Sequence, residues 1–192
     1  MNLKDFAGKS FKIDDEIELR PWQVTDAEAV FEAVKRNYDH LRTFMEWIKP
    51  DHSIEDYERF IDREMSGTTE NKDLGFGIFR AGTLIGTIGL GYFDHDAKVT
   101  EIGYWIDSSE EGKGIISKAC ETLIDFAFRD LGMNRIQIRC ATANVRSAAI
   151  PERFGFTKEG VQRQHVMRDG KLYDFAIYGL LASEWRRRDK QI

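Results

Sequence analysis

The feature that most constrains the fold is a change of hydrophobic period across a short glycine-containing segment. Residues 99–106 are rich in β-branched and aromatic side chains, as strands are, whereas residues 112–131 place apolar side chains at helical spacing. Gly112 and Gly114 stand at the junction, and Gly132 follows the helical pattern. A strand that passes through such a loop into a helix points backbone N–H groups and a positive dipole end at one place. The segment therefore predicts a site for an anionic group such as phosphate.

Other interpretations of this loop are open on its residues alone. Two glycines between a strand and a helix also suit a plain tight turn. Neither the GxxxxGK[ST] pattern nor GxGxxG occurs at the turn, which disfavours nucleotide hydrolases and dinucleotide dehydrogenases. The loop predicts a phosphate-bearing ligand of another class.

The rest of the chain alternates between the two periods in a regular order. A capping box of Thr25 with Glu28 predicts the first helix, and Ser53 with Asp56 predicts the second. Two further helices are predicted over residues 112–131 and 147–154. Strands are predicted at residues 17–20, 75–79, 83–92, 99–106, 135–141, 161–167 and 172–181. The order βααβββαβαββ, with 42% hydrophobic residues and no repeat or linker, predicts a single α+β domain over residues 1–192, with a core of about 17–185.

Charge and cysteine usage exclude several classes of partner. Twenty-eight Lys and Arg against 33 Asp and Glu give a net charge of −5, so direct DNA binding is not expected. The cationic residues 186–188 are expected to be solvated. Cys120 and Cys140 lack ligand spacing and are expected to be buried thiols, with no metal site. No apolar run is long enough to cross a bilayer, which predicts a cytoplasmic protein that binds no membrane. A homo-oligomer is left open.

Residues 111–116 resemble the pyrophosphate loop of GNAT acetyltransferases, written [QR]-x-x-G-x-[GA]. Glu111 stands where that pattern has Gln or Arg, Gly114 matches its glycine, and Ile116 replaces its small last residue. A carboxylate cannot donate a hydrogen bond to phosphate, so backbone amides and Lys113 are expected to do so.

The resemblance continues along the chain in order. Residues 101–106 resemble the fourth strand of the Rim-type branch, which acetylates N-terminal amines of ribosomal proteins. Residues 144–147 and 152–156 resemble the N-x-x-S and (E/K)-x-x-G-F segments of the family, and Asp174, Tyr178 and residues 184–185 resemble the ending of that branch. The likeness is strongest over residues 75–185. It implies the GNAT fold, a mixed and mostly antiparallel sheet flanked by helices, with a V-shaped slot for acetyl-CoA between the fourth and fifth strands.

The resemblance also implies a function and a set of site residues. It implies transfer of an acetyl group from acetyl-CoA to a primary amine by direct attack, foremost the N-terminal α-amine of a protein such as a ribosomal protein. A small-amine acetyltransferase, with a polyamine or aminoglycoside-like acceptor, and a non-catalytic acyl-CoA-binding sensor are the alternatives. The residues expected to contact the cofactor are Trp105, Ile106, Asp107, Glu111, Gly112, Lys113, Gly114, Ile115, Ile116, Asn144, Ser147 and Arg153.

The catalytic residues are less narrowly defined. Ser147 is the candidate that protonates the departing thiolate, although a serine there also suits a helix N-cap. Glu101, Asp174 and His165 are the candidates for the general base. Each has a structural alternative: a surface ion pair for Glu101, an internal hydrogen bond for Asp174, and a solvated position for His165.

Overall fold

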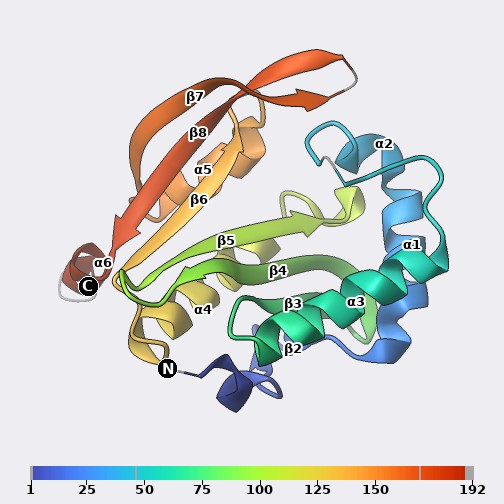
Figure 1. Cartoon of the computed structure of the whole chain (residues 1–192), viewed down its shortest axis with the longest axis horizontal. Helices are drawn as coiled ribbons and strands as arrows, with labels where there is room; N and C mark the ends of the chain where they lie inside the picture. Colours follow the sequence, from blue (N-terminus) through green and yellow to red (C-terminus); the bar gives the residue numbers. More distant parts are fainter. Residues whose placement is uncertain (1, 46, 169, 189–192) are drawn as a thin grey trace.

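A computed structural model describes residues 2–45, 47–168 and 170–188, which form an eight-stranded sheet flanked by helices (Figure 1). The strand order is β1-β2-β3-β4-β5-β6-β8-β7. Neighbouring strands are antiparallel except for β5 and β6, which are parallel. This mixed, mostly antiparallel sheet confirms the predicted fold class. The strands are β1 (Phe11–Lys12), β2 (Ile17–Pro21), β3 (Leu74–Arg80), β4 (Thr83–Asp94), β5 (Val99–Ile106), β6 (Arg135–Ala141), β7 (Thr157–Arg168) and β8 (Lys171–Leu181).

All seven predicted strands are present, and their ends differ from the predicted ones by a few residues. The two-residue strand β1 was not predicted, because a pair of residues is too short to show a period of two. The predicted fourth and fifth strands are therefore β5 and β6. The helices are α1 (Ala27–Arg36), α2 (Tyr38–Leu41), α3 (Ile54–Thr69), α4 (Ile115–Arg129), α5 (Val145–Arg153) and α6 (Ala182–Arg188), with 3-10 turns η1 (Leu3–Phe6), η2 (Val24–Asp26) and η3 (Ser108–Glu110). Within the described residues, no helix is long and apolar enough to span a bilayer.

The start of the first helix differs from the prediction. The capping box joins Gln23 and Asp26, whose carboxylate accepts the Gln23 N–H at 2.8 Å, so the predicted box of Thr25 with Glu28 is wrong. Asp26 is buried and is also held by Arg20, with an Nη2 to Oδ1 distance of 2.7 Å. This ion pair fixes the Asp26 carboxylate within the η2 turn, and the regular helix α1 begins at Ala27, one residue later than a cap at Thr25 would imply.

Two other helix starts follow from local hydrogen bonds. The box predicted at α3 is confirmed, since the Ser53 N–H donates to Asp56 Oδ2 at 2.9 Å. Helix α5 begins at Val145, earlier than predicted, because Asn144 is its N-cap and accepts the Ser147 N–H at 3.1 Å. Ser147 lies inside the first turn, so its hydroxyl is not the cap. The turn between β7 and β8 falls partly on residue 169, which lies outside the described residues.

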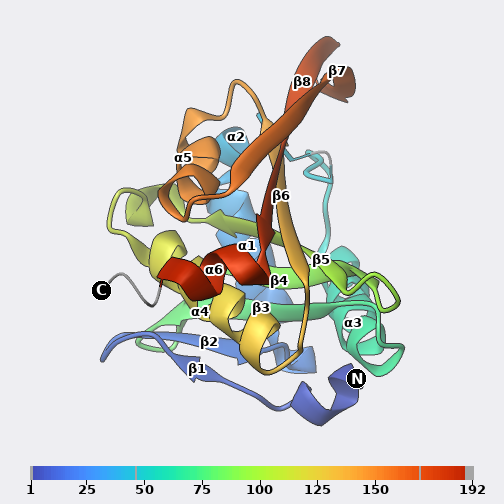
Figure 2. The same cartoon turned by 90° about the vertical axis from the view of Figure 1, so that its left-hand side faces the viewer.

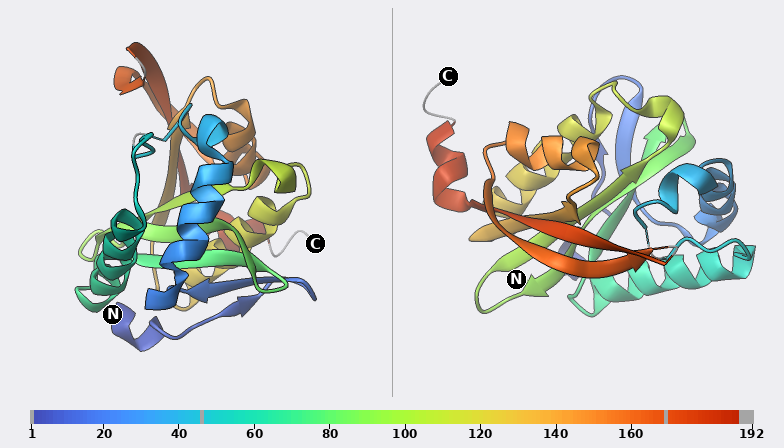
Figure 3. Two further views of the ribbon diagram at one scale, coloured as in Figure 1. Left: turned by 90° about the vertical axis from the view of Figure 1, so that its right-hand side faces the viewer. Right: turned by 90° about the horizontal axis from the view of Figure 1, so that it is seen from above.

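The two faces of the sheet are covered by different layers. Helices α1 and α3 lie over one face and α4 over the other (Figures 1 to 3). Strand β5 divides its side chains between them: Ile102 belongs to the core beneath α4, and Trp105 belongs to the core beneath α1 and α3. The hairpin of β7 and β8 extends from the sheet toward the segment after α2, where the Phe44 and Tyr173 rings lie 6.4 Å apart (Figure 3).

A partly buried carboxyl group lies where α3 packs on the sheet. A Cβ on Gly75 of β3 would collide with the Glu64 carboxylate, so only glycine allows this approach. Burial raises the pKa of Glu64 to about 7, with a smaller contribution from the charge of Asp73. The fold therefore disfavours the ionised form of Glu64.

We expect Glu64→Gln to stabilise the fold at high pH. In the unfolded chain Glu64 loses its proton near pH 4.3, and in the fold it does so only near pH 7, so the free energy of unfolding falls as the pH rises through this window. The advantage of the variant should grow between pH 5 and pH 8 to a value on the order of 2 kcal/mol. Urea unfolding at both pH values measures it. A difference that does not change with pH would contradict this expectation.

Candidate acetyl-CoA site

The parallel pairing of β5 and β6 covers only three residues on each strand. It runs from the pair of Val99 and Arg135 to the pair of Glu101 and Gln137. Beyond Glu101 the strands separate, while β5 remains paired to β4 on its other edge and β6 to β8 (Figure 1). The open edge of β5 faces a cleft of about 970 Å³, here called the β5/β6 cleft. An extended ligand can pair with such an edge as an added strand does.

The loop at one end of this cleft has the geometry of an anion cradle. Gly112 and Gly114 have φ values of 75° and 77°, which glycine adopts without strain, and a Cβ at either position would point into open space. Gly114 is the N-cap of α4, and no side chain of the described residues caps that end. Because Lys118 N–H is bonded to the Gly114 carbonyl, the N–H groups of residues 115–117 precede the helical ladder. These donors and the helix dipole suit a diphosphate.

The size and composition of the cleft fit the expected cofactor. Its volume lies within the range of small-molecule and cofactor sites, and its walls combine apolar side chains with a few polar groups. A strand edge for an amide-containing arm and a glycine cradle for phosphates are both present. The predicted cofactor contacts that line it are Trp105, Ile106, Glu111, Gly112, Gly114, Ile115, Ile116, Asn144, Ser147 and Arg153.

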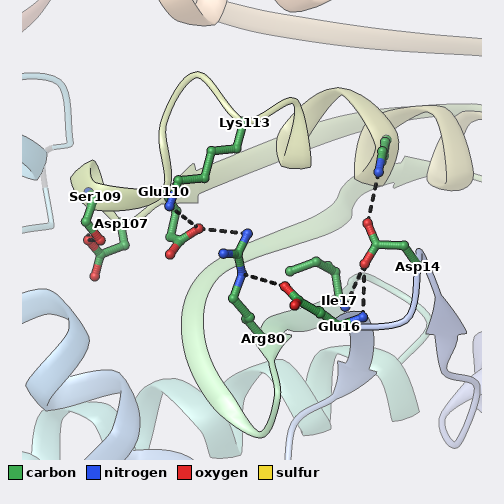
Figure 4. A network of polar contacts seen from close by, with 9 residues as sticks. Asp14, Glu16, Ile17, Arg80, Asp107, Ser109, Glu110 and Lys113 are labelled. Carbon is green, nitrogen blue, oxygen red and sulfur yellow. Dashed lines mark hydrogen bonds and ion pairs between the residues drawn. The ribbon is translucent and has the colours of Figure 1, made fainter.

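Asp107 and Lys113 have side chains that do not line the cleft. The Lys113 ammonium is held by Glu110 at 3.1 Å, and Glu110 also binds Arg80 of β3 at 3.0 Å (Figure 4). Asp107 is buried and accepts hydrogen bonds from Arg36 Nε at 2.6 Å and from the Ser109 N–H at 3.0 Å. Both side chains bond other residues of the protein and so anchor the loop. The backbone of the loop, rather than the Lys113 side chain, therefore faces the cleft.

The environment of Asp107 favours its charged form. Burial alone would raise the pKa of Asp107, but hydrogen bonds, first that of Arg36, outweigh burial and hold the pKa well below its usual range. A carboxyl group with a lowered folded-state pKa stabilises the fold above its unfolded-state pKa, and this contribution disappears as the pH falls toward the folded-state value.

We therefore expect Asp107→Asn to lower the free energy of unfolding at pH 7 by about 1 to 3 kcal/mol, because the buried carboxylate loses its charge-assisted hydrogen bonds to Arg36 and Ser109. The difference in free energy of unfolding between wild type and variant should become smaller below about pH 4, where Asp107 of the unfolded chain takes up its proton. Chemical unfolding at pH 7 and pH 3.5 provides the measurement. An equal gap at both pH values would show that ionisation of Asp107 contributes nothing.

Ser147 lies in the cleft beside a tyrosine that the sequence did not single out. The hydroxyl of the partly buried Tyr104 donates to the Ser147 carbonyl at 3.1 Å and lies 3.3 Å from Ser147 Oγ. Pro151 has no N–H to bond the carbonyl four residues before it, which is that of Ser147, so this carbonyl is free to accept from Tyr104. Burial raises the pKa of Tyr104, so its hydroxyl keeps its proton at neutral pH. Strand alternation, which turns Tyr104 to the face opposite Trp105, is the signal that could have found it.

The three candidates for the general base do not line the β5/β6 cleft. Glu101 lies on β5 at its last pairing with β6, and its carboxylate accepts from Arg139 Nε at 2.7 Å and Gln137 Nε2 at 2.9 Å. Asp174 accepts the Gln164 N–H at 2.8 Å inside the β7/β8 hairpin. His165 is exposed on β7 beside a phenylalanine ring. Of the three, Glu101 lies at the apex where the strands separate. The described residues contain no group of three or more His, Cys, Asp or Glu able to hold a metal ion.

Comparison with known proteins agrees with this geometry. The model of the acetyltransferase (GNAT) domain family matches residues 16–157. A Bacillus subtilis (strain 168) protein named "Putative ribosomal N-acetyltransferase YdaF" is 35% identical over 175 residues, which cover 91% of this chain and 96% of the relative. The ribosomal-protein-serine acetyltransferase of Escherichia coli (strain K12) is 26% identical over 170 residues, covering 88% and 95%.

One similar solved structure contains acetyl-CoA. The microcin C7 self-immunity acetyltransferase MccE, crystallised with acetyl-CoA and AMP, superposes with a TM-score of 0.83 at 31% identity, covering 91% of this chain and 96% of that one. The family match spans well over half of the chain, and the glycine cradle and the open edge of β5 both border the β5/β6 cleft. The chain therefore belongs to the GNAT acetyltransferase family and is an acetyl-CoA-dependent N-acetyltransferase.

Proposed function

We propose that this enzyme acetylates the N-terminal α-amine of a protein, with a ribosomal protein as the foremost acceptor. The names of the Bacillus and Escherichia relatives support the acceptor class. Such an acceptor also puts the reaction in the cytoplasm, where ribosomes work.

The observation that carries this choice is the state of the candidate base. The Glu101 carboxylate accepts hydrogen bonds from Arg139 and Gln137, so it is an ion-paired group whose Oε2 is already engaged. An α-amine with a pKa of about 7.7 to 8.0 is partly neutral at neutral pH, whereas a lysine amine with a pKa of about 10.4 needs a stronger base. The site suits the α-amine better.

Bound acetyl-CoA supplies a thioester that the neutral amine attacks directly. In this proposal Glu101 takes the proton released by the amine through a water molecule. Ser147, with the Tyr104 hydroxyl 3.3 Å from its Oγ, gives a proton to the sulfur as the carbon–sulfur bond breaks. Water then returns a proton to Ser147 and removes the one held by Glu101, so both side chains return to their starting states.

A thiol-release assay with acetyl-CoA and a set of amines tests the acceptor class. The set contains peptides with free N-terminal Ser or Ala, the same peptides with a blocked N-terminus and an internal lysine, and polyamines. We expect release only with free α-amines. Faster release with polyamines would favour a small-amine enzyme. The likeness to MccE supports this alternative, because the MccE structure contains a small molecule, AMP, as well as acetyl-CoA. Binding of CoA without any release would favour the sensor.

A further inference from the structure

The loop that forms the cradle carries acidic side chains, although its expected ligand is an anion. Glu110 and Glu111 both line the β5/β6 cleft. Lys113, the cation of the loop itself, is turned away and bound to Glu110 (Figure 4). A diphosphate that approaches the N–H groups of residues 115–117 would meet the Glu111 carboxylate, and like charges repel at such short range. Two arginines of α5 can offset this charge: Arg153 lines the cleft and donates to Ser117 Oγ at 2.8 Å, and Arg146 is bonded to Glu111 itself.

Glu111 is joined to two basic side chains that come from different elements. Its Oε1 lies 3.1 Å from His40 Nε2 of α2, and its Oε2 is bonded to Arg146 Nη1 of α5. Glu111, His40 and Arg146 all line the β5/β6 cleft. The bridge therefore runs from the loop to the first turn of α5, beside Gly112 and Gly114.

Arg146 keeps most of its hydrogen-bonding capacity. A guanidinium has five N–H donors, and within the part of the chain that the structure describes Arg146 is bonded to Glu111 alone. The Arg146 side chain is 73% exposed, whereas that of Glu111 is only 20% exposed. The carboxylate thus holds one edge of the guanidinium, and the remaining N–H groups are available to a ligand. The planar fork of arginine suits phosphate oxygens.

We propose that Arg146 is a phosphate-binding cation of this enzyme and that Glu111 is the residue that positions it. Glu111 occupies the place where the family pattern has a donor side chain, and here it supplies a donor indirectly by holding a guanidinium from α5. This cation of the cradle comes from across the cleft instead of from the loop. This inference rests on acetyl-CoA binding in the β5/β6 cleft but not on the identity of the acceptor.

Calorimetric binding of CoA and of pantetheine, which lacks the phosphates, tests this assignment. We expect Arg146→Gln to weaken CoA binding about tenfold, equivalent to about 1.4 kcal/mol, with pantetheine binding unchanged. Arg146→Lys should restore part of the loss. Lys113→Gln should have a smaller effect on CoA than Arg146→Gln, and Arg187→Gln, an exposed cation on α6, should have none.

The CoA affinity of Glu111→Gln shows whether Glu111 positions Arg146 or only repels phosphate. If Glu111 positions Arg146, the variant binds CoA more weakly, and adding Arg146→Gln to it causes little further loss, because the two residues act as one unit. If Glu111 only repels phosphate, the variant binds CoA more tightly, and the proposal is overturned. Unchanged CoA affinity in Arg146→Gln, or an equal loss of pantetheine affinity, would also overturn it. CoA binding that responds as expected in an enzyme that does not acetylate α-amines would refute the proposed function alone.

Discussion

Removing both hydroxyls at the Tyr104 and Ser147 contact is expected to lower kcat by about two to four orders of magnitude, the usual range for a lost general acid. The Tyr104→Phe and Ser147→Ala double variant should keep most of its affinity for CoA, because both hydroxyls line the cleft outside the glycine cradle that holds the phosphates. Steady-state thiol release measures kcat, and calorimetry measures the affinity. The two single variants should not be additive, because the hydroxyls lie within hydrogen-bonding distance of each other.

The matched control for this prediction is Tyr178→Phe. Tyr178 of β8 is buried, and its hydroxyl bonds Glu152 of the same helix α5 at 3.2 Å, but it does not line the cleft. Removing the Tyr178 hydroxyl tests whether the fall in kcat arises only because a tyrosine no longer anchors α5. A kcat for Tyr178→Phe as low as that of Tyr104→Phe would remove Tyr104 and Ser147 from the proton-transfer role.

Substitution of Gly114 is expected to have the second large effect, on binding. Gly114→Ala places a Cβ in the open space of the cradle and forces alanine to a φ of 77°, so CoA affinity should fall at least about tenfold. The free energy of unfolding should fall by about 1 to 2 kcal/mol from backbone strain. Calorimetry with CoA and thermal unfolding measure the two effects.

Gly132 provides the control at the other end of the same helix. It has a φ of 64°, and an added Cβ would point into equally open space, so Gly132→Ala should cost similar stability. It lies beyond the C-terminal end of α4, away from the loop, and CoA affinity should not change. Equal losses of affinity in both variants would mean that the effect comes from strain in the helix and not from the cradle.

The cradle was predicted from a local pattern, whereas the open strand edge was implied by the resemblance to the GNAT family. Gly112 and Gly114 mark a change of period that only a strand, loop and helix can satisfy, and the structure has this arrangement. The open edge of β5 follows from the fold class, because its parallel neighbour pairs with it over only three residues. A local pattern such as this change of period can be recognised in the sequence without knowledge of the tertiary structure.

The side-chain partners across the cleft could not be predicted in this way. His40 lies on the four-residue helix α2, which is too short to show a helical period, and Arg146 meets Glu111 only through the packing of α5 against the loop. The roles of Asp26 and Asn144 as caps depended on which neighbouring carboxylate or amide the fold placed within reach. Long-range ion pairs are set by tertiary structure and leave no periodic signal.

Transfer of an acetyl group to a protein α-amine is tested most directly by locating the acetyl group on a peptide product. The enzyme is incubated with acetyl-CoA and a peptide that has an N-terminal serine and an internal lysine, and fragmentation mass spectrometry identifies the modified residue. We expect acetylation of the N-terminal residue alone. An acetyl group on the lysine side chain, or an unmodified peptide beside an enzyme that binds CoA, would contradict the proposed function.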